Sequence, residues 1–404
     1  MKICYLCADR GIWLAKHNGA SAHFRSLVRT FSSLGHEVVA LTPSTDGSED
    51  LGVPVVHIPT PEILEPLFSE ADDLGVTRSK IERPARRRLC HALGHLWNNI
   101  LVEQTLRNVL PRYRPNLLFE VYSPYGVAGC MMTKRLGIPY ILNVHAPLAW
   151  EGQQYRQQAL QEAAEGLEEI AFAAAPRIIT NSCELRDQLV AAGVAASKVT
   201  AIPNGVDVEM FSPDGPTYHK DLEGKLVIGF VGSLKRWHGL DILAEAFRRL
   251  AADPRVHLLV VGDGPEARVL HSLAAELPGR ITLVGAVPMV EVPAYIRAMD
   301  IAVAPYPALE RFYFSPLKVL EYLAAGRAVV ASGIGQLNEL IRDGETGLLV
   351  PPGDPAALAE ALGKLAADQD LRQTLGAAAA VEARRAHTWR QRASEILALA
   401  EVMP

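Results

Sequence analysis

Short apolar runs rich in β-branched residues alternate with stretches of helical periodicity along nearly the whole chain. This alternation is typical of βαβ units, in which parallel strands form a sheet that helices cover on both faces. The expected strands are residues 2–7, 37–42, 53–58, 116–121, 140–144 and 177–180 in the first half, and residues 225–232, 257–261, 281–284, 301–304, 328–332 and 347–350 in the second. The pattern therefore predicts an α/β protein with two doubly wound, Rossmann-like domains.

The joint between the two domains is expected within residues 202–216, where Asn204-Gly205 and three prolines interrupt the strand and helix patterns. A chain of 404 residues has room for two domains at about 150 residues each. We therefore assign residues 1–202 to an N-terminal domain and residues 203–385 to a second domain. Residues 386–404 are expected to form a C-terminal helix that crosses back to the first domain.

The composition is that of an ordinary globular protein, with 49% hydrophobic residues, 21% charged residues, and 40 basic against 45 acidic side chains for a net charge of −5. Nothing in this balance indicates a nucleic-acid partner. The chain shows neither a signal-peptide pattern nor a run of 18 apolar residues. We therefore expect a soluble, cytoplasmic protein.

The cysteines are odd in number and scattered, which favours a reducing compartment over a disulfide framework: Cys4, Cys7, Cys90, Cys130 and Cys183. Cys4 and Cys7 have the spacing of a metal pair. On a strand, however, positions i and i+3 point to opposite faces, so both side chains could not reach one ion. We expect buried core cysteines.

A basic and apolar stretch covers residues 78–101. Its cations are Arg78, Lys80, Arg83, Arg86, Arg87 and Arg88, and they lead into an apolar stripe at helical spacing: Leu89, Leu93, Leu96, Trp97, Ile100 and Leu101. Such a helix could bind an anionic membrane surface, at the inner membrane face, or an acidic acceptor. The alternative is a long helix of the N-terminal domain with its stripe in the core and its arginines in solvent.

The segment from 312 to 332 predicts a short helix between two buried strands. Ser315 suits the N-cap, Pro316 the first helical position, and Gly326 the residue just past the end. The start of this helix should face the carboxyl edge of the sheet, where open α/β folds bind ligands. Lys318 stands in the first turn, where the helix dipole disfavours a cation unless an anion is bound. The helix thus indicates a phosphate site, with a solvated lysine as the alternative.

A second basic feature is the loop 233–239, which follows the strand 225–232. Lys235 and Arg236 are adjacent cations in a glycine-bounded loop at the same sheet edge. They could clamp a diphosphate through charge-assisted hydrogen bonds. The alternative is that both are ordinary surface residues.

Gly262-Asp263-Gly264-Pro265-Glu266-Ala267 follows an apolar strand and matches the glycine fingerprint of dinucleotide-binding domains. That fingerprint also needs an acidic residue about 20 positions on, at the tip of the next strand. Here the tip reads Leu283-Val284-Gly285. A nicotinamide-dependent dehydrogenase is therefore disfavoured.

Taken together, the motifs make the chain resemble family four of the retaining glycosyltransferases, which have the GT-B fold and use nucleotide-activated sugars. The matching segments are Gly19-Ala20-Ser21, Gly35-His36-Glu37-Val38, Ile202-Pro203-Asn204-Gly205-Val206-Asp207, Gly229-Phe230-Val231-Gly232, Val261-Gly262-Asp263-Gly264-Pro265, residues 321–330 and residues 343–350. Each is common alone, and their order and spacing are specific.

The resemblance implies roles for individual residues in holding the donor. Arg236 and Lys235 meet the diphosphate, although the family's lysine before the glycine of this loop is replaced by His238. Backbone groups of Ser315, Pro316, Leu317 and Lys318 hold the diphosphate and sugar, and Glu321 accepts hydrogen bonds from the ribose. Gly264 belongs to the donor-binding loops, and the loop at Gly285 lines the base.

Further implied residues concern the transferred sugar. Gly19 corresponds to a flexible loop that closes over the donor, and His145 to a histidine beside the sugar. Without the resemblance, His145 would be interpreted as a histidine that caps a strand end. Of the family's paired glutamates, the first falls on Tyr313 and is missing, and Glu310 nearby is out of register.

The sequence therefore predicts an enzyme that moves a sugar from a nucleoside diphosphate to a small-molecule, lipid-linked or glycan acceptor, with retention and with no cofactor or metal. Lys318, Arg236 and the helix start would neutralise the leaving diphosphate. The resemblance implies that the leaving phosphate takes the acceptor proton. Asp368-Gln369-Asp370 has the spacing of metal-binding carboxylates but suits a helix start better. The alternatives are a GT-B epimerase or phosphorylase, and a non-catalytic nucleotide-sugar binding protein.

Overall fold

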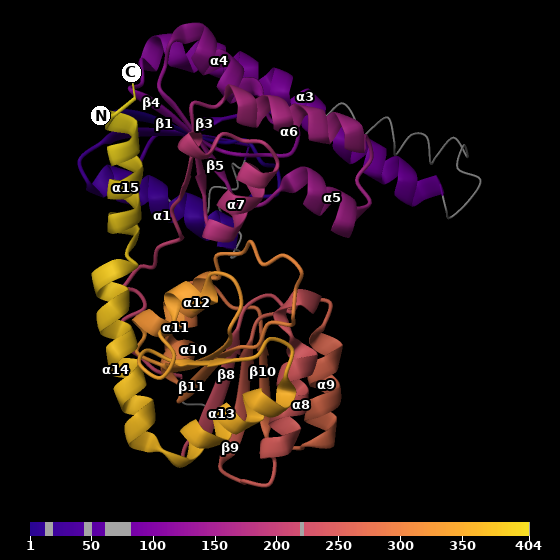
Figure 1. Cartoon of the computed structure of the whole chain (residues 1–404), viewed down its shortest axis with the longest axis vertical. Helices are drawn as coiled ribbons and strands as arrows, with labels where there is room; N and C mark the ends of the chain where they lie inside the picture. The colour runs from indigo at the N-terminus through magenta and orange to yellow at the C-terminus, as the bar shows by residue number, and fades with distance from the viewer. Residues whose placement is uncertain (13–18, 44–50, 61–81, 219–221, 404) are drawn as a thin grey trace. The chain divides into compact units, whose positions relative to one another are not determined.

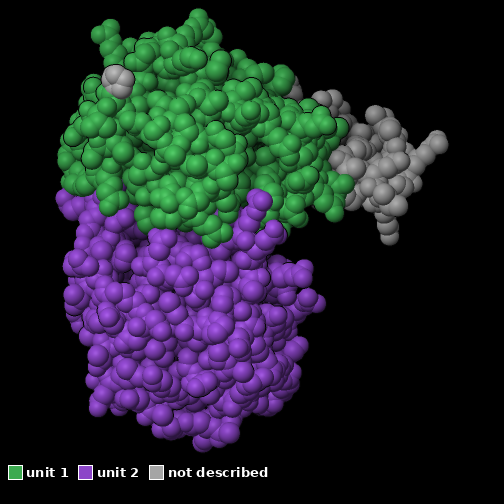
Figure 2. Space-filling view, viewed as in Figure 1, with its two compact units in different colours: residues 1–16, 20–203, 393–404 green, residues 17–19, 204–392 purple. Residues whose placement is uncertain are grey.

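The structure is a computed structural model that describes residues 1–12, 19–43, 51–60, 82–218 and 222–403, with the side chains of residues 82–87 left out. Its residues form two compact units (Figure 2). The first contains residues 1–16, 20–203 and 393–404, and the second contains residues 17–19 and 204–392. Residues 393–404 thus cluster with the first unit although they follow the second in the chain.

The first unit holds a parallel sheet of seven strands in the order β3-β2-β1-β4-β5-β6-β7 (Figure 1). The strands are β1 (Lys2–Cys7), β2 (Glu37–Thr42), β3 (Val55–His57), β4 (Leu117–Val121), β5 (Tyr140–Val144), β6 (Arg177–Thr180) and β7 (Val199–Ala201). The helices are α1 (Gly19–Ser33), α3 (Glu82–Tyr113), α4 (Ala128–Leu136), α5 (Leu148–Arg156), α6 (Gln161–Ala174) and α7 (Cys183–Ala191), with a short 3-10 turn η1 (Ala196–Lys198).

The second unit holds a parallel sheet of six strands in the order β10-β9-β8-β11-β12-β13. The strands are β8 (Leu226–Val231), β9 (Val256–Val261), β10 (Ile281–Gly285), β11 (Ile301–Ala304), β12 (Ala328–Ser332) and β13 (Leu348–Val350). The other elements are the 3-10 turn η2 (Arg236–His238), α8 (Leu240–Leu250), α9 (Ala267–Glu276), α10 (Val292–Arg297), α11 (Leu317–Ala324), α12 (Leu337–Leu340), α13 (Pro355–Ala367) and α14 (Gln369–Ala386). The last helix, α15 (Trp389–Glu401), begins in the second unit and continues into residues that cluster with the first.

Helices cover both faces of the second sheet. Apolar residues of α8, α9 and α13 pack on one face, and those of α10, α11, α12 and α14 on the other. Because both faces are buried, the strands are continuous apolar runs such as Val256–Val261. The predicted doubly wound α/β fold with two sheets is therefore confirmed.

Each sheet reverses its strand order at one point, between β1 and β4 in the first and between β8 and β11 in the second. Loops that leave the carboxyl ends of such strands diverge to opposite faces and leave room for a ligand. The residues after β1, β4, β8 and β11 are therefore where a site is expected in each unit.

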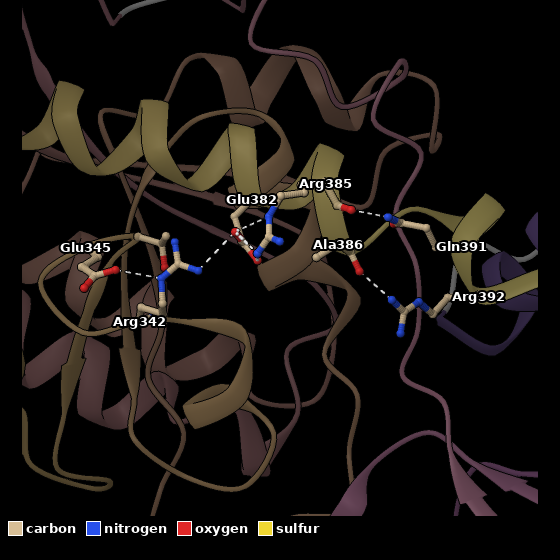
Figure 3. A network of polar contacts seen from close by, with 8 residues as sticks. Arg342, Glu345, Glu382, Arg385, Ala386, Gln391 and Arg392 are labelled. Carbon is tan, nitrogen blue, oxygen red and sulfur yellow. Dashed lines mark hydrogen bonds and ion pairs between the residues drawn. The ribbon is translucent and has the colours of Figure 1, made fainter. Parts of the chain in front are cut away.

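The end of α14 is held by polar side chains (Figure 3). Gln391 and Arg392 donate hydrogen bonds to the carbonyls of Arg385 and Ala386. Because these carbonyls belong to the last turn of α14, the helix itself offers them no N–H donor. Arg342 bridges Glu345 and Glu382 at 2.8 and 3.1 Å, and Glu382 also pairs with Arg385. The turn between α14 and α15 is thereby fixed to the second unit.

Three expectations about local structure are corrected. Strand β7 is short, and the sequence analysis did not predict it. Ser315 is not the N-cap of α11, because the cap position is Pro316. Most of the apolar stripe of α3 is not in the core: Leu89, Leu93, Trp97 and Ile100 are 37 to 48% exposed, whereas Leu96 and Leu101 are partly buried. The helix buries Ala92, Val102, Leu106 and Leu110.

Candidate functional site

Three glycines shape the loops at the carboxyl edge of the second sheet. Gly262 has φ +136°, and a Cβ there would lie 2.0 Å from the Gly232 carbonyl oxygen. A Cβ on Gly264 would lie 2.5 Å from the carbonyl oxygen of Leu234. The glycine fingerprint therefore serves close packing of the loop after β9 against the loop after β8, which brings the backbone of both to one place.

Lys318 is the central charged group at this edge. It is the second residue of α11, and its Nζ lies 4.1 Å from the ring centroid of Phe230 and 5.9 Å from that of Tyr306. The buried Nζ has no hydrogen-bond acceptor among the described residues. Desolvation by burial lowers the pKa of Lys318 to about 7. A buried amine without an acceptor is costly, and a bound anion would remove that cost.

Glu321 lies one turn further along α11 and is 9% exposed. Burial raises the pKa of its carboxyl to about 7, and the charge of Lys318 opposes this shift. The next residue, Tyr322, anchors the helix, because its hydroxyl accepts a hydrogen bond of 2.7 Å from the Val231 backbone N–H. The start of α11 is therefore held beside the end of β8.

Ser315 has a different partner from the one expected. Its Oγ accepts a hydrogen bond of 3.1 Å from the Asn204 backbone N–H, and the Asn204 Nδ2 donates to the Ser315 carbonyl at 2.9 Å. The hydroxyl that was expected to cap α11 is thus used to hold the segment before it. No side chain caps this helix, so the N–H groups of Leu317 and Lys318 stay available to a ligand, whereas the Val319 N–H donates to the Pro316 carbonyl at 3.1 Å.

The loop after β8 presents its basic residues unequally. Arg236 is exposed and Lys235 is half-buried. His238 packs against three aromatic rings, those of Phe230, Trp237 and Tyr306. Burial first, and then the charge of Lys318, lower the pKa of His238 to about 3. Sequence reasoning noted His238 only as a departure from a motif and missed that it lies in the environment of Lys318.

The aromatic segment before α11 is part of the core. Tyr313 is 2% exposed, and its ring centroid lies 4.5 Å from that of Phe314, which in turn stacks near Trp237. Glu310 is exposed.

Gly285 ends β10 with φ +81°, and its carbonyl accepts a hydrogen bond from the Gly262 N–H at 2.7 Å. A side chain at Gly285 would meet open space.

In the first unit, His145 follows β5 and belongs to a buried cluster. The Asn143 side-chain amide lies 3.0 Å from Nε2 of His145 and 3.3 Å from Nε2 of His23, and the two imidazole rings are 4.3 Å apart. Burial lowers the pKa of His145 to about 4. When both rings are neutral, each Nε2 accepts a hydrogen bond from the Asn143 amide. The ring hydrogen of His145 then lies on Nδ1, which can act as a donor.

A second polar cluster lies after β1, and the sequence analysis did not single it out. Asp9 is half-buried, and its Oδ1 accepts a hydrogen bond of 2.7 Å from the Gly11 N–H. Burial raises its pKa, while the charges of Arg156 and His91 oppose that shift. His91 stacks edge-on against His95 at 4.5 Å. The only sequence signal was an acidic residue directly after the first buried strand.

Gly19 is the exposed first residue of α1.

The remaining expectations concern metal sites and membrane spans. Asp368 caps α14, because its Oδ1 accepts from the Leu371 N–H at 2.9 Å, so the helix-start interpretation is confirmed. Cys4 and Cys7 are buried with free thiols. In the part of the chain that the structure describes, no three His, Cys, Asp or Glu side chains are grouped to hold a metal ion. None of the described helices is both long and apolar enough to cross a membrane.

Comparison with known proteins places these features in a family. The model described as "Glycosyl transferases group 1" matches residues 225–368, and the one described as "Glycosyltransferase Family 4" matches residues 17–210. The chain is 32% identical over 306 residues to a D-inositol 3-phosphate glycosyltransferase of Stackebrandtia nassauensis, covering 70% of this chain and 68% of that protein. It is 35% identical over 229 residues to a phosphatidyl-myo-inositol mannosyltransferase of Mycobacterium leprae, covering 56% and 59%.

Solved structures share the fold over the whole length. A crystal structure of Anabaena Alr3699/HepE in complex with UDP superposes with a TM-score of 0.72 at 19% identity and covers 100% of both chains. The structure of WaaG, described as a glycosyltransferase involved in lipopolysaccharide biosynthesis, gives a TM-score of 0.66 at 15% identity, covering 99% of this chain and 100% of WaaG. At these identities the likeness concerns the GT-B fold alone.

Proposed function

We propose, from the premise that this chain belongs to the group 1, family 4 glycosyltransferases, that the start of α11 in its second unit binds the diphosphate of the nucleotide-sugar donor. As a member of this family, the protein is an enzyme that transfers a sugar from a nucleotide sugar with retention of anomeric configuration. The observation that carries the proposal is the buried Lys318 Nζ, which has no acceptor among the described residues.

The groups around Lys318 suit an anion that becomes more negative as the reaction proceeds. When the bond from the sugar to the diphosphate breaks, negative charge grows on the leaving phosphate. Lys318 and the uncapped N–H groups of α11 would stabilise this charge most strongly in the transition state. Lys235 and Arg236 would then act as outer cations, since Arg236 is exposed, Lys235 belongs to the same loop, and the Nζ of Lys318 is buried.

We assign the other donor contacts along the same edge. The backbone of Ser315, Pro316 and Leu317 would face the diphosphate and sugar, and the carboxylate of Glu321 would accept hydrogen bonds from the ribose. Gly264 would lie beside the diphosphate. Gly285 would leave room for the base, because a side chain there would meet open space. In the first unit, His145 has an Nδ1–H that can donate to a sugar hydroxyl, and Gly19, which clusters with the second unit, is assigned to the donor-binding residues.

For the acceptor we propose a phosphorylated polyol, free or lipid-linked, bound by the first unit. Relatives at 32 and 35% identity are named for D-inositol 3-phosphate and phosphatidyl-myo-inositol. The cluster of Asp9, His91 and Arg156 combines a carboxylate, which can accept from polyol hydroxyls, with a cation that can bind phosphate. Arg156→Ala should therefore raise KM for a phosphorylated acceptor by about tenfold or more and leave KM for donor unchanged.

We further propose that α3 contacts an anionic membrane surface from one side. Its exposed apolar residues are Leu89, Leu93, Trp97 and Ile100, and they follow Arg88 on the same helix. An apolar stripe beside basic residues is the pattern of a helix that lies in the membrane interface. Sedimentation with vesicles containing anionic lipid tests this: Trp97→Glu should release the protein, while the same change at exposed Val381 of α14 should not.

A screen of nucleotide sugars tests the proposed donor function. A donor at 100 times its dissociation constant adds about 2.7 kcal/mol of stability, which thermal unfolding detects. The nucleotide sugar that raises the unfolding temperature should also support transfer to inositol 3-phosphate or phosphatidylinositol, with the product retaining the anomeric configuration. Stabilisation that persists fully in Lys318→Met would place the diphosphate elsewhere.

A further inference from the structure

The hydrogen bonding of His238 defines which of its nitrogens can meet a ligand. Nδ1 lies 2.5 Å from the Ser233 carbonyl oxygen. A carbonyl oxygen only accepts, so Nδ1 carries the hydrogen. In the neutral ring Nε2 then carries a lone pair, and the hydrogen bond of the ring to the described residues is the one made by Nδ1. A lone pair repels an anion, so a neutral His238 cannot bind phosphate through Nε2.

His238 and Lys318 share the same two aromatic walls. The Phe230 ring centroid lies 6.1 Å from that of His238 and 4.1 Å from the Lys318 Nζ. The Tyr306 ring centroid lies 5.7 Å from that of His238 and 5.9 Å from the Nζ. An anion that reaches Lys318 therefore comes close to the imidazole as well.

The groups around His238 keep it neutral while the site is empty. Lys318 from α11 and Lys235 from its own loop are cations, Tyr306 after β11 contributes a neutral phenol, and Glu321 lies beyond Lys318 with a raised pKa. Burial and the two lysines hold the pKa of His238 at about 3. A diphosphate would reverse this balance, because its negative charges offset the positive charges of both lysines and favour the imidazolium form of His238.

We infer that His238 takes up a proton when a nucleoside diphosphate binds beside Lys318, and that its Nε2–H then donates to a phosphate oxygen. This inference rests on the proposed donor site. The proton comes from solvent, adds to the Nε2 lone pair, and returns to solvent when the nucleotide leaves, so no other reactant is needed. The donor site would thus gain its second buried cation only in the complex.

The sign of the pH dependence follows from this linkage. A ligand that raises a pKa binds more weakly as pH rises from the free value towards the bound value, by up to about tenfold per pH unit. Above the bound value the affinity no longer depends on His238. Lys318 and the ligand phosphate titrate too, so the contribution of His238 is isolated at about pH 6 by comparing the wild-type chain with His238→Lys, whose amine, like that of Lys318, should already be mostly protonated at this pH.

Calorimetric titration of the full chain with UDP, GDP and ADP, at about pH 6 in two buffers of different ionisation enthalpy, measures the protons taken up on binding. At this pH Lys318 is already mostly protonated, since its pKa is about 7. We expect the wild-type chain to take up about one proton more than His238→Lys for the diphosphate that binds. The control is His271→Lys, the same substitution at an exposed position of α9, which should behave as wild type.

A second variant guards against misfolding of the first. His238→Gln keeps a neutral N–H donor, so it should take up no more protons than His238→Lys and should bind about tenfold more weakly than wild type. Equal proton uptake in wild type, His238→Lys and His238→Gln would overturn the inference while leaving the diphosphate site intact. If none of the three diphosphates binds the wild-type chain, the proposed donor site and the inference both fail.

Discussion

Lys318 is a residue whose chemistry conflicts with its surroundings. An amine that is buried against Phe230 and has no acceptor among the described residues loses its hydration and gains the contacts with the Phe230 and Tyr306 rings and the charge of Glu321. Groups with strongly shifted pKa values and no structural partner are concentrated at functional sites. A diphosphate would supply the missing acceptor, which is why the site is assigned to this residue rather than to exposed Arg236.

Replacing Lys318 by methionine should stabilise the protein. The thioether fills the space against Phe230 without the desolvation penalty of the amine, so the free energy of unfolding should rise by about 1 to 3 kcal/mol. Chemical denaturation at about pH 6 measures this. Glu321, with its pKa of about 7, is mostly neutral at this pH, so removing the charge of Lys318 does not leave an unpaired buried carboxylate. A large loss of stability would mean that Lys318 holds the fold together.

The two residues at the family's glutamate positions should behave differently. A carboxylate that binds the ribose acts equally before, during and after transfer, so Glu321→Gln should raise KM for the donor more than it lowers kcat. Tyr313→Phe should change both constants little, since Tyr313 is packed in the core against Phe314. Steady-state kinetics separates these cases. A collapse of kcat at unchanged KM in Glu321→Gln would move this residue to the reacting sugar.

At the scale of elements, the apolar runs were enough to predict most strands. β1, β2, β5, β6, β11 and β12 match the expected bounds, because a strand buried on both faces must be a continuous apolar run. The end of α11 was also predicted correctly: Gly326 follows its C-cap with φ +67°, a conformation that glycine adopts without a steric penalty. Short β7 lacks such a run and was missed.

The errors have one physical cause, which is competition from residues far away in the sequence. Ser315 has the chemistry of an N-cap, but Asn204, 111 positions away, uses its hydroxyl. The stripe of α3 has helical spacing, but the helix buries a neighbouring face with Ala92 and Val102, and Ala92 packs against Ala149 of α5 and Ala164 of α6. The packing of His238 beside Lys318 likewise arises only when β8 and α11 meet. Such partners cannot be derived from local patterns.

Strand β4 gives a prediction about pH. Glu120 is buried, accepts a hydrogen bond of 2.6 Å from the Tyr140 hydroxyl, and has its pKa raised to about 7 by burial. Because the folded value exceeds the unfolded one, the neutral acid stabilises the fold fully below about pH 4.5, and this stabilisation is lost as pH rises through about 7. Glu120→Gln should therefore be more stable than wild type at about pH 8, by about 2 to 3 kcal/mol, and similar at about pH 4.5.

Urea unfolding at a series of pH values checks this difference. Glu162→Gln, at an exposed position of α6, provides the control and should follow the wild-type profile. If Glu120→Gln shows the same pH dependence as wild type, the carboxyl of Glu120 stays in one protonation state over this range, and its burial does not set the profile.

For the whole molecule, the family and the two sheets could be recognised from the order of motifs, whereas the acceptor could not. The loops at the carboxyl edge of the first sheet carry the polar residues after β1, and their chemistry suits more than one polyol phosphate. We expect transfer to survive exhaustive chelation, since Lys318 and the α11 N-terminus can stabilise the leaving diphosphate. A more than tenfold loss on EDTA treatment that magnesium or manganese restores would contradict this.

The affinity of Lys318→Met for the nucleoside diphosphate that the wild-type chain binds tests the central claim most directly. Calorimetry with UDP, GDP and ADP identifies that ligand, and wild type and variant are then compared at one pH and ionic strength. Loss of a charge-assisted contact of about 1.5 to 3 kcal/mol predicts binding that is weaker by a factor of about 10 to 100, with the fold intact. Equal affinity in both proteins would show that the diphosphate does not contact Lys318 and that the site lies elsewhere.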